Sequence, residues 1–419
     1  MDQVVISGGQ NLQGKVTIGG AKNAALPILA STLLSGGDCV VANLPQVRDV
    51  VTMVKLLHLL GVSCQSEGSC VTLNASTING TEAPYDLVKT MRASVLVLGP
   101  LLARFGEATV SLPGGCAIGT RPVNLTLKGL MTLGAEVFVE HGYIRAKALG
   151  LKGGRIELDF PTVTGTENLL MAACLATGTT VLHNAAKEPE IVDLAEFLIQ
   201  RGAKIFGAGT DTITIQGVHE LHGAEYTVTP DRVEAGTYLM AGAVTQGDVY
   251  VDQCIPGHLS AVLNKLQEAG SVVVEEKRGV RLTATKRLKP VEIKTLVYPG
   301  FPTDLQAQMM ALMCVASGTS VISETIFESR FSHVPELHRM GASIEVDGHH
   351  AVIQGRPSLT GAPVMASDLR ASAGLILAGL AAEGKTTVSR VYHLDRGYER
   401  FEEKLQGLGA TVQRISDSE

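Results

Sequence analysis

The 419-residue sequence contains no tryptophan, and its aromatic residues make up only 4% of the chain. Proteins that bind single-stranded nucleic acid without sequence preference stack the bases on aromatic side chains, so this scarcity argues against that class. The sequence has no excess of basic residues either, because it contains 35 Lys and Arg but 41 Asp and Glu, which gives a formal net charge of −6. Binding to nucleic-acid phosphates draws on excess positive charge. We therefore expect no nucleic-acid partner.

The sequence also lacks the signals of zinc binding, secretion and membrane insertion. Its seven cysteines form no CxxC pair, and their odd number is typical of reduced thiols in a cytosol. The first residues, MDQVVISGGQ, contain neither the basic segment nor the apolar run of a signal peptide. The longest apolar stretch, 93–103, is shorter than the roughly 20 residues that span a bilayer. These absences predict a soluble cytoplasmic protein without a membrane partner.

What the sequence does contain is a large apolar fraction and much glycine. Hydrophobic residues make up 45% of the chain and charged residues only 18%, which is typical of a globular protein. A chain of 419 residues is too long for one ordinary core, so two domains are expected. The 46 glycines favour many short elements joined by tight turns.

Two sets of glycines recur with a period of about 70 residues. Glycines of the first set end amphipathic segments and precede strand-like stretches, and they are Gly61, Gly134, Gly202, Gly270, Gly341 and Gly409. Glycines of the second set follow nearly all-apolar segments, and they are Gly36, Gly106, Gly178, Gly247, Gly318 and Gly384. We expect the glycines of the second set to end buried helices as C-caps. The two sets together predict six structural repeats.

Each repeat follows the order α-β-α-β-β, or βαβαββ if it is counted from an earlier strand. Its first helix, as at 303–317 and 369–383, is apolar on nearly every face, which indicates burial. Its second helix, as at 191–201 and 399–408, is amphipathic. The fold class is therefore α/β, or α+β, with three repeats in each domain.

The expected boundaries fall near residues 20 and 230, where the chain crosses between the two domains. The N-terminal domain comprises 21–229, and the C-terminal domain comprises 1–20 plus 230–419, closed by a strand at 3–7.

Charged residues recur at the starts of the predicted helices. Buried helices begin at Lys22, Arg92, Asp304 and Arg370, and amphipathic helices begin at Arg48, Arg121 and Arg396. An aspartate there, such as Asp304 or Asp368, is explained by an N-cap that accepts backbone N–H bonds. Cations at a helix N-terminus oppose the helix dipole instead. Their repetition favours a bound polyanion that supplies the missing negative charge.

Cys116 lies in the glycine-rich segment LPGGCAIGTRP between a predicted strand and an amphipathic helix. Arg121, five residues further on, favours the thiolate form, and a proton donor on a closing loop fits this setting. A lone cysteine is equally consistent with a small buried hydrophobic residue. The residues by themselves leave both interpretations open.

The sequence resembles the UDP-N-acetylglucosamine enolpyruvyl transferase family over its whole length. Seven segments carry the resemblance: GGAKNAALPILA (19–30), PYDLVKTMRAS (84–94), LPGGCAIGTRPV (112–123), NAAKEPEIVD (184–193), FPTDLQAQ (301–308), DLRAS (368–372) and HLDRGYERFEEKL (393–405). The resemblance implies a two-domain inside-out α/β barrel, or prism, like that of EPSP synthase, with the substrates between the domains. It also implies enolpyruvyl transfer from phosphoenolpyruvate to the 3′-hydroxyl of UDP-N-acetylglucosamine through a tetrahedral ketal, the first committed step of peptidoglycan synthesis.

By this resemblance, Asp304 takes the proton from the sugar 3′-hydroxyl. Cys116 protonates or covalently traps the enolpyruvyl carbon and is the residue alkylated by fosfomycin. Lys22 and Arg396 complete the implied catalytic set. The residues implied to bind phosphoenolpyruvate are Lys22, Asn23, Arg92, Arg121, Arg370 and Arg396. Those implied to bind UDP-N-acetylglucosamine are Asn23, Arg92, Arg121, Pro122, Val123, Asn124, Leu125, Thr162, Val163, Asp304 and Ile326, the last through its backbone.

No cofactor or metal is expected, because fixed cations offset the developing charge, and we expect a monomer. The sequence departs from one common pattern of the family at Arg48, Asn124, Thr126 and Phe160, all but Arg48 on the nucleotide side. Two alternatives remain: the sister transferase acting on shikimate 3-phosphate, and a non-catalytic paralogue that binds UDP-sugars. The first lacks the cysteine of LPGGC, and the second is expected to lose Cys116, Asp304 or Arg396.

Overall fold

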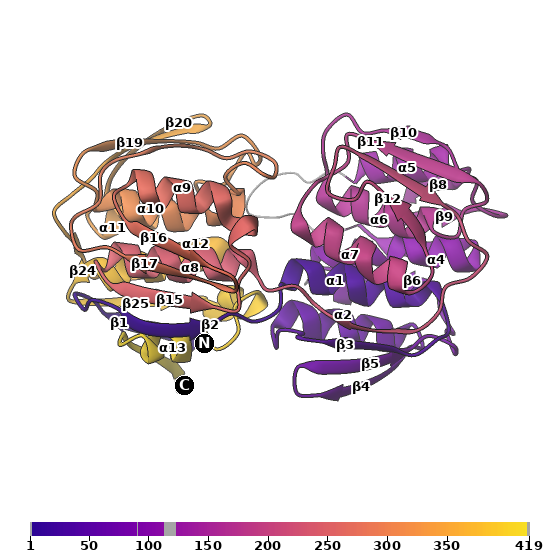
Figure 1. Cartoon of the computed structure of the whole chain (residues 1–419), viewed down its shortest axis with the longest axis horizontal. Coiled ribbons are helices and arrows are strands. Elements are labelled where there is room, and N and C mark those ends of the chain that lie inside the picture. The colour runs from indigo at the N-terminus through magenta and orange to yellow at the C-terminus, as the bar shows by residue number, and fades with distance from the viewer. Residues whose placement is uncertain (1, 90, 113–122, 417–419) are drawn as a thin grey trace. The chain divides into compact units, whose positions relative to one another are not determined.

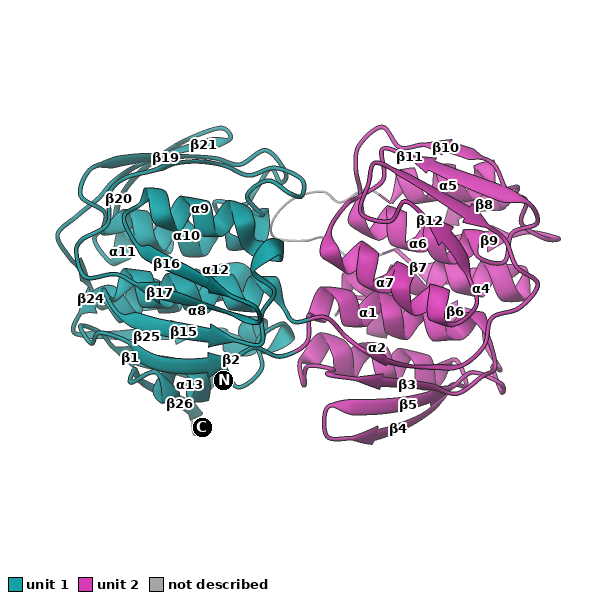
Figure 2. Ribbon diagram, viewed as in Figure 1, with its two compact units in different colours: residues 1–19, 116–120, 230–419 teal, residues 20–115, 121–229 magenta. Residues whose placement is uncertain are grey.

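The computed structural model describes residues 2–89, 91–112 and 123–416. These residues divide into two compact units (Figure 2). Unit 1 contains residues 2–19 and 230–416, and unit 2 contains residues 20–89, 91–112 and 123–229. In each unit, helices pack side by side with four-stranded sheets around them (Figure 1). Across the described ranges, no helix combines the length and apolar character needed to span a membrane.

Unit 2 has three four-stranded sheets among its described residues. The strands, in spatial order, are β14 (Ala224–Thr227), β3 (Cys39–Ala42), β5 (Cys70–Asn74) and β4 (Ser63–Glu67); β6 (Glu82–Ala83), β7 (Glu107–Ser111), β9 (Tyr143–Lys147) and β8 (Glu136–Glu140); and β10 (Arg155–Glu157), β11 (Thr179–His183), β13 (Thr212–Gln216) and β12 (Lys204–Phe206). In each sheet the first strand is parallel to the second, and the other pairs are antiparallel.

Unit 1 repeats this arrangement. Its strands, in spatial order, are β2 (Gln13–Thr17), β15 (Asp248–Asp252), β17 (Gly279–Thr283) and β16 (Val272–Glu276); β18 (Glu292–Lys294), β19 (Thr319–Ser323), β21 (His350–Gln354) and β20 (Ser343–Asp347); and β23 (Pro363–Met365), β25 (Lys385–Ser389), β1 (Asp2–Ser7) and β26 (Thr411–Ser416). β22 (Leu359–Thr360) and β24 (Ala382–Glu383) form a short separate pair. The N-terminal strand β1 lies antiparallel between β25 and β26 and so completes the sheet of the last repeat.

Each unit buries three helices, one from each repeat. In unit 2 they are α1 (Lys22–Ser31), α4 (Leu98–Phe105), which continues η2 (Arg92–Val97), and α6 (Val163–Ala173). In unit 1 they are α8 (Arg232–Val244), α10 (Gln306–Cys314), which follows η4 (Thr303–Leu305), and α12 (Leu369–Ala381). The helices predicted at 303–317 and 369–383 are thereby confirmed, with the first of them starting as a 3₁₀ turn.

The remaining helices cover the outside of each repeat. They are α2 (Arg48–Leu59), α5 (Asn124–Thr132), α7 (Pro189–Gln200), α9 (Ser260–Glu268), α11 (Val334–Arg339) and α13 (Phe401–Gly407). The short elements are α3 (Tyr85–Val88), η1 (Thr32–Leu34), η3 (Pro256–Leu259) and η5 (Val391–Arg396). The amphipathic helices predicted at 191–201 and 399–408 correspond to α7 and α13.

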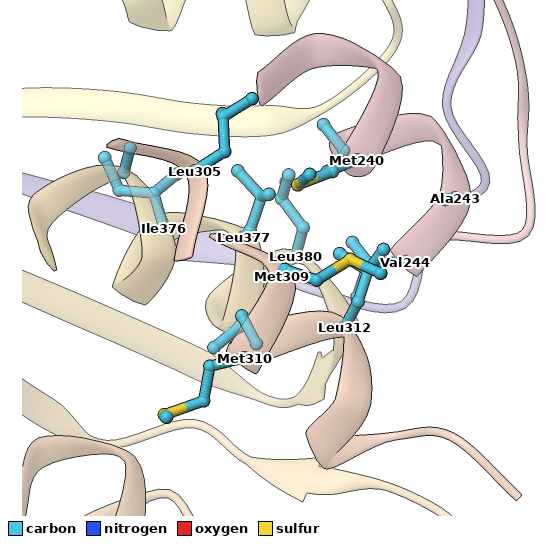
Figure 3. Packing of buried hydrophobic residues seen from close by; sticks show 14 of the residues in the cluster. Met240, Ala243, Val244, Leu305, Met309, Met310, Leu312, Ile376, Leu377 and Leu380 are labelled. Carbon is cyan, nitrogen blue, oxygen red and sulfur yellow. The ribbon is translucent and has the colours of Figure 1, made fainter. Parts of the chain in front are cut away.

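The core of unit 1 forms where α8, α10 and α12 pack on one another (Figure 3). Leucine and methionine side chains fill the space between them, and Met240, Met309 and Leu377 are fully buried. Burial of one such side chain contributes roughly 1.5–3 kcal/mol. Because these helices contact other helices or sheets on nearly every side, they need apolar residues all round, as the sequence pattern indicates.

The C-cap predicted for the second set of glycines is confirmed for Gly106, Gly178 and Gly384, whose φ angles are positive, and the first set adopts the same conformation throughout. All six glycines of the first set adopt left-handed φ angles between 85° and 101°, the conformation of a helix C-cap. In the second set, Gly36, Gly247 and Gly318 do not adopt positive φ, so a C-cap role is wrong for these three. Gly247 is needed for close approach instead, because a Cβ atom there would lie 2.1 Å from the carbonyl oxygen of Leu12.

We predict that Gly247→Ala lowers the free energy of unfolding by about 2 kcal/mol or more, because the added methyl group forces β2 and β15 apart. Gly257→Ala is the matched control, since a Cβ atom at Gly257 meets nothing within 4 Å. Urea denaturation of both variants measures the difference. Equal stability of the two variants would show that the backbone at Gly247 has room for a side chain.

Candidate active site

In unit 1, one carboxylate lies between two buried arginines at the N-terminal ends of α10 and α12. Arg330 donates to Oδ1 of Asp304 at 2.9 Å, and Arg370 donates to Oδ2 at 2.8 Å. The arginine side chains are only 4% and 5% exposed, whereas the Asp304 side chain is 26% exposed. Both guanidinium groups are thus shielded from water, and the carboxylate they hold keeps access to it.

The two aspartates that could have been helix caps have different roles. Asp368 is the N-cap of α12, because its Oδ1 accepts from the backbone N–H groups of Arg370 at 2.8 Å and Ala371 at 3.1 Å. The capping interpretation is confirmed for Asp368. It is wrong for Asp304, which lies inside η4 and makes no side-chain cap. The reason is that arginines from two other segments reach its carboxylate.

Burial and charge together set the protonation states around this carboxylate. Burial lowers the pKa of Arg370, but the adjacent Asp304 more than compensates, so the pKa lies above its usual value. Burial also raises the pKa of Asp368, yet Arg330 and the capping N–H groups bring it below the ordinary range. His333, which is 1% exposed, has a pKa lowered to about 4 by burial. At neutral pH, Arg370 and Asp368 are therefore charged, and His333 is neutral.

Sequence reasoning missed Arg330 and His333. Counting back 13 residues from Gly341, as for the other amphipathic helices, puts the start of this helix at Glu328, whereas α11 begins at Val334. Both residues lie between β19 and α11, in a segment without regular periodicity. The mixed polar and apolar sequence ESRFSHV gives no sign of the partners of its arginine and histidine.

Unit 2 uses the same device with lysine. Lys22 is the first residue of α1, and its Nζ lies 3.3 Å from Oδ2 of Asp49 in the first turn of α2. Their side chains are 12% and 5% exposed. α1 has no side-chain N-cap. The cation in its first turn is instead balanced by the carboxylate of Asp49 on α2. The sequence pattern predicts that a bound polyanion balances the cations at the helix starts. In the structure, part of this positive charge is balanced by carboxylates of the protein itself.

Three further carboxyl groups gather in unit 2 near the N-terminal ends of α6 and α7. Glu167 of α6 is 3% exposed, Glu190 is equally buried in the first turn of α7, and Glu188 precedes that helix. Burial, and after it the negative charges of Glu190 and Glu188, raise the pKa of Glu167 well above its usual value. The folded protein therefore holds a proton at Glu167 that the unfolded chain releases at lower pH.

This difference makes the stability depend on pH with a definite sign. Because folding raises the pKa of Glu167, the folded state binds the extra proton, and its contribution to stability falls as pH rises above 4.5. We predict that Glu167→Gln becomes progressively more stable than the parent as pH rises. Urea denaturation at increasing pH measures this gap. Glu225→Gln, at an exposed glutamate, is the control and should stay within about 0.5 kcal/mol. A stability difference between Glu167→Gln and the parent that narrows as pH rises would contradict the raised pKa of Glu167.

The remaining predicted site residues fall in separate places. Lys22 and Asn23 adjoin at the start of α1, Arg92 begins η2, and Arg396 ends η5; all four are partly buried. Thus Lys22, Asn23 and Arg92 belong to unit 2, and Asp304, Arg370 and Arg396 belong to unit 1. Asp304 and Arg370 are two predicted residues from distant segments that the structure brings into contact. Cys116, Arg121 and Pro122 lie outside the described residues.

The nucleotide-side predictions fall at helix starts and in one loop. Thr162 is the N-cap of α6, and its hydroxyl accepts from Gly165 N–H at 3.3 Å; Val163 then begins the helix. Val123 and Asn124 flank the start of α5, and Leu125 packs on the unit 2 core. The N–H of Ile326 donates to Oε1 of Glu324 at 2.8 Å.

The described residues form no metal-binding cluster near the charged helix starts, and the cavity described below lies away from them. Within the described part of the chain, His, Cys, Asp and Glu form no group of three or more suited to a metal ion. A cavity of about 350 Å³ in unit 2 is lined by Leu34–Gly36, Ala103, Arg104 and Leu175, near the C-terminal ends of the buried helices. Lys22 and Arg92 begin those helices, so the cavity lies at the opposite end. Arg104 is engaged by the carbonyl oxygens of Leu33 and Ala75, both at 2.9 Å.

Comparison with known proteins gives matches along almost the whole chain. Residues 6–405 match the family described as EPSP synthase (3-phosphoshikimate 1-carboxyvinyltransferase). UDP-N-acetylglucosamine 1-carboxyvinyltransferase of Trichlorobacter lovleyi is 57% identical over 418 residues, covering 100% of both chains. The enzyme of that name from Myxococcus xanthus is 57% identical over 99% of both chains.

Solved structures agree with these matches. The enolpyruvyl transferase NikO from Streptomyces tendae aligns with a TM-score of 0.89 and 27% identity over 99% of both chains. EPSP synthase from Acinetobacter baumannii aligns with a TM-score of 0.78 and 19% identity, over 99% of this chain and 100% of its own, which is a likeness of fold alone. The predicted EPSP-synthase-like fold class is confirmed.

Proposed function

The chain belongs to the enolpyruvyl transferase family of EPSP synthase and, within it, to the UDP-N-acetylglucosamine 1-carboxyvinyltransferases, and on that premise we propose how its residues divide the reaction. It is a transferase that moves the enolpyruvyl group of phosphoenolpyruvate to the 3′-hydroxyl of UDP-N-acetylglucosamine and releases phosphate. The relatives that share 55–57% of its residues over 99–100% of its length all have this name, so the reading with shikimate 3-phosphate as acceptor is disfavoured.

Asp304 acts as the base that takes the proton of the 3′-hydroxyl. The observation that carries this assignment is a carboxylate that accepts hydrogen bonds from two buried arginines while a quarter of its side chain stays exposed. Each carboxylate oxygen has two lone pairs, so Oδ1 and Oδ2 can accept a substrate hydroxyl in addition to one arginine bond. A carboxylate that is fixed, charged and accessible suits a general base.

The anionic groups of phosphoenolpyruvate bind at Lys22, Asn23, Arg92, Arg370 and Arg396. Lys22, Arg92 and Arg370 lie at or next to the first residues of α1, η2 and α12, whereas Arg396 is the last residue of η5. Helix N-termini and fixed cations attract phosphate and carboxylate groups together. Asp49 holds the Lys22 ammonium in place before the substrate arrives, which lowers the entropy cost of binding. Arg121 is assigned to the same anion on the resemblance alone.

In the addition step, the 3′-oxygen forms a bond to C2 of phosphoenolpyruvate while Cys116 delivers a proton to C3, which gives a tetrahedral ketal. In the elimination step, the bond from C2 to the phosphate oxygen breaks, and C3 returns its proton to the Cys116 thiolate, which restores the double bond. The proton that Asp304 took from the 3′-hydroxyl leaves with the phosphate. Atoms and charge balance without a redox partner. The nucleotide side is assigned to residues 121–125, to the start of α6 at Thr162 and Val163, and to the carbonyl of Ile326.

We predict that Asp304→Asn lowers kcat by at least about 10²-fold, because the amide cannot accept the hydroxyl proton. Substrate affinity should change much less, since the side chain keeps its shape and one acceptor oxygen. Phosphate release with phosphoenolpyruvate and UDP-N-acetylglucosamine measures the rate, and isothermal titration measures nucleotide-sugar binding. Asp347→Asn, at an exposed aspartate of β20 in the same unit, is the control.

Three outcomes would overturn parts of this proposal. A near-parental rate in Asp304→Asn would remove Asp304 from the base role. Phosphate release by the parent chain with shikimate 3-phosphate, and none with UDP-N-acetylglucosamine, would reverse the choice of acceptor. Release with neither acceptor, together with retained nucleotide-sugar binding, would favour the non-catalytic paralogue.

A further inference from the structure

A small polar network is buried directly behind the Asp304–Arg370 pair. It joins Thr237 of α8, Gln308 of α10 and Tyr398, which follows η5. Thr237 and Gln308 are 0% exposed and Tyr398 is 4% exposed, in a core otherwise filled by leucine and methionine. A buried polar group costs free energy unless it is hydrogen-bonded, so such a network in an apolar core calls for a reason.

The hydrogen bonds set the donor and acceptor roles. The two amide hydrogens of Gln308 are shared among three acceptors, and its Oε1 has no partner among the described residues. The Gln308 amide nitrogen lies 3.2 Å from the carbonyl oxygen of Asp304, 3.2 Å from Thr237 Oγ1 and 3.1 Å from the Tyr398 hydroxyl. A carbonyl can only accept, so the nitrogen must face it. The Thr237 hydroxyl donates to the carbonyl of Val233 at 2.8 Å. Its 2.9 Å bond with Tyr398 therefore takes the tyrosine hydrogen, which leaves the tyrosine oxygen to accept from Gln308.

Tyr398 also lies against the arginine that holds the base. The guanidinium carbon of Arg370 is 5.6 Å from the centroid of the Tyr398 ring, and the same guanidinium donates to Asp304 at 2.8 Å. Tyr398 thus reaches Asp304 by two routes. One runs through Gln308 to the backbone carbonyl of Asp304, and the other runs through Arg370 to its carboxylate.

We propose that the Tyr398 hydroxyl is a positioning group that, together with Gln308 and Thr237, fixes both the backbone and the carboxylate of Asp304 for proton transfer. The proposal rests on the assignment of Asp304 as the base. Its physical reason is that a displacement of about 1 Å in a reacting group can cost on the order of 10²-fold in rate. The contacts come from α8, from α10 and from the segment after η5, so the packing of three repeats sets the position of one carboxylate.

The test compares two tyrosine hydroxyls of the same core. Tyr398→Phe removes the hydroxyl and keeps the ring under Arg370. Tyr238→Phe is the matched control, because Tyr238 is fully buried, its ring lies 5.4 Å from Phe401 as Tyr398 lies 4.9 Å from it, and its hydroxyl has no hydrogen-bond partner among the described residues. We expect Tyr398→Phe to lower kcat on the order of tenfold with KM for both substrates within about twofold, and Tyr238→Phe to change neither.

A second arm separates positioning from general loosening of the core. Thr237→Val removes the acceptor of the tyrosine hydrogen, so the double variant with Tyr398→Phe should have nearly the kcat of either single variant. Losses that multiply would contradict a shared role, as would a kcat in Tyr398→Phe no lower than in Tyr238→Phe, or a loss that appears mainly as raised KM.

Asp304→Asn is measured in the same assay to keep the two assignments apart. If it retains the parental kcat, the base assignment fails, and the positioning proposal fails with it. If it is inactive while Tyr398→Phe retains full kcat, only the positioning proposal fails.

Discussion

The site in unit 1 depends on one carboxylate that neutralises two buried guanidinium groups. Taking a cation out of water costs several kcal/mol, and a close carboxylate with good geometry offsets much of that cost. Asp304 offsets the cost of burying Arg330 and Arg370 at once, because each of its two carboxylate oxygens contacts one of these arginines. Without it, two like charges would face each other at the N-terminal ends of apolar helices, where the helix dipoles oppose them further.

Unit 2 applies the same constraint at Lys22, whose ammonium is held by Asp49 at the start of the neighbouring helix. In both units a cation that we assign to anion binding is held in place by a carboxylate from another segment. The helices behind these groups are apolar and tightly packed, so the charged ends have few alternative positions. Rigid placement of fixed charges is what a transferase needs to stabilise a developing negative charge without reorganisation.

The six repeats and their buried helices could be predicted from the sequence, because a left-handed glycine recurs once in each repeat and an all-round apolar helix has a distinct pattern. The partners Asp49 and Arg330 could not. They come from segments whose own sequence carries no sign of the contact, and only the packing of the repeats brings them to Lys22 and Asp304. Gly247 shows the same limit, since close approach to Leu12 is a property of two distant strands.

Tyr398 lies within a segment that carries the family resemblance, yet its hydrogen bonds to α8 and α10 are visible only in three dimensions.

The interaction on which the site depends is the compensation of the buried charges of Arg330 and Arg370 by Asp304. A double-mutant cycle of Asp304→Asn and Arg330→Met, read by urea denaturation, tests it most directly. We expect Asp304→Asn to lower the free energy of unfolding by about 2 kcal/mol or more, and the addition of Arg330→Met to restore part of that free energy. Strictly additive losses in the double variant would contradict it.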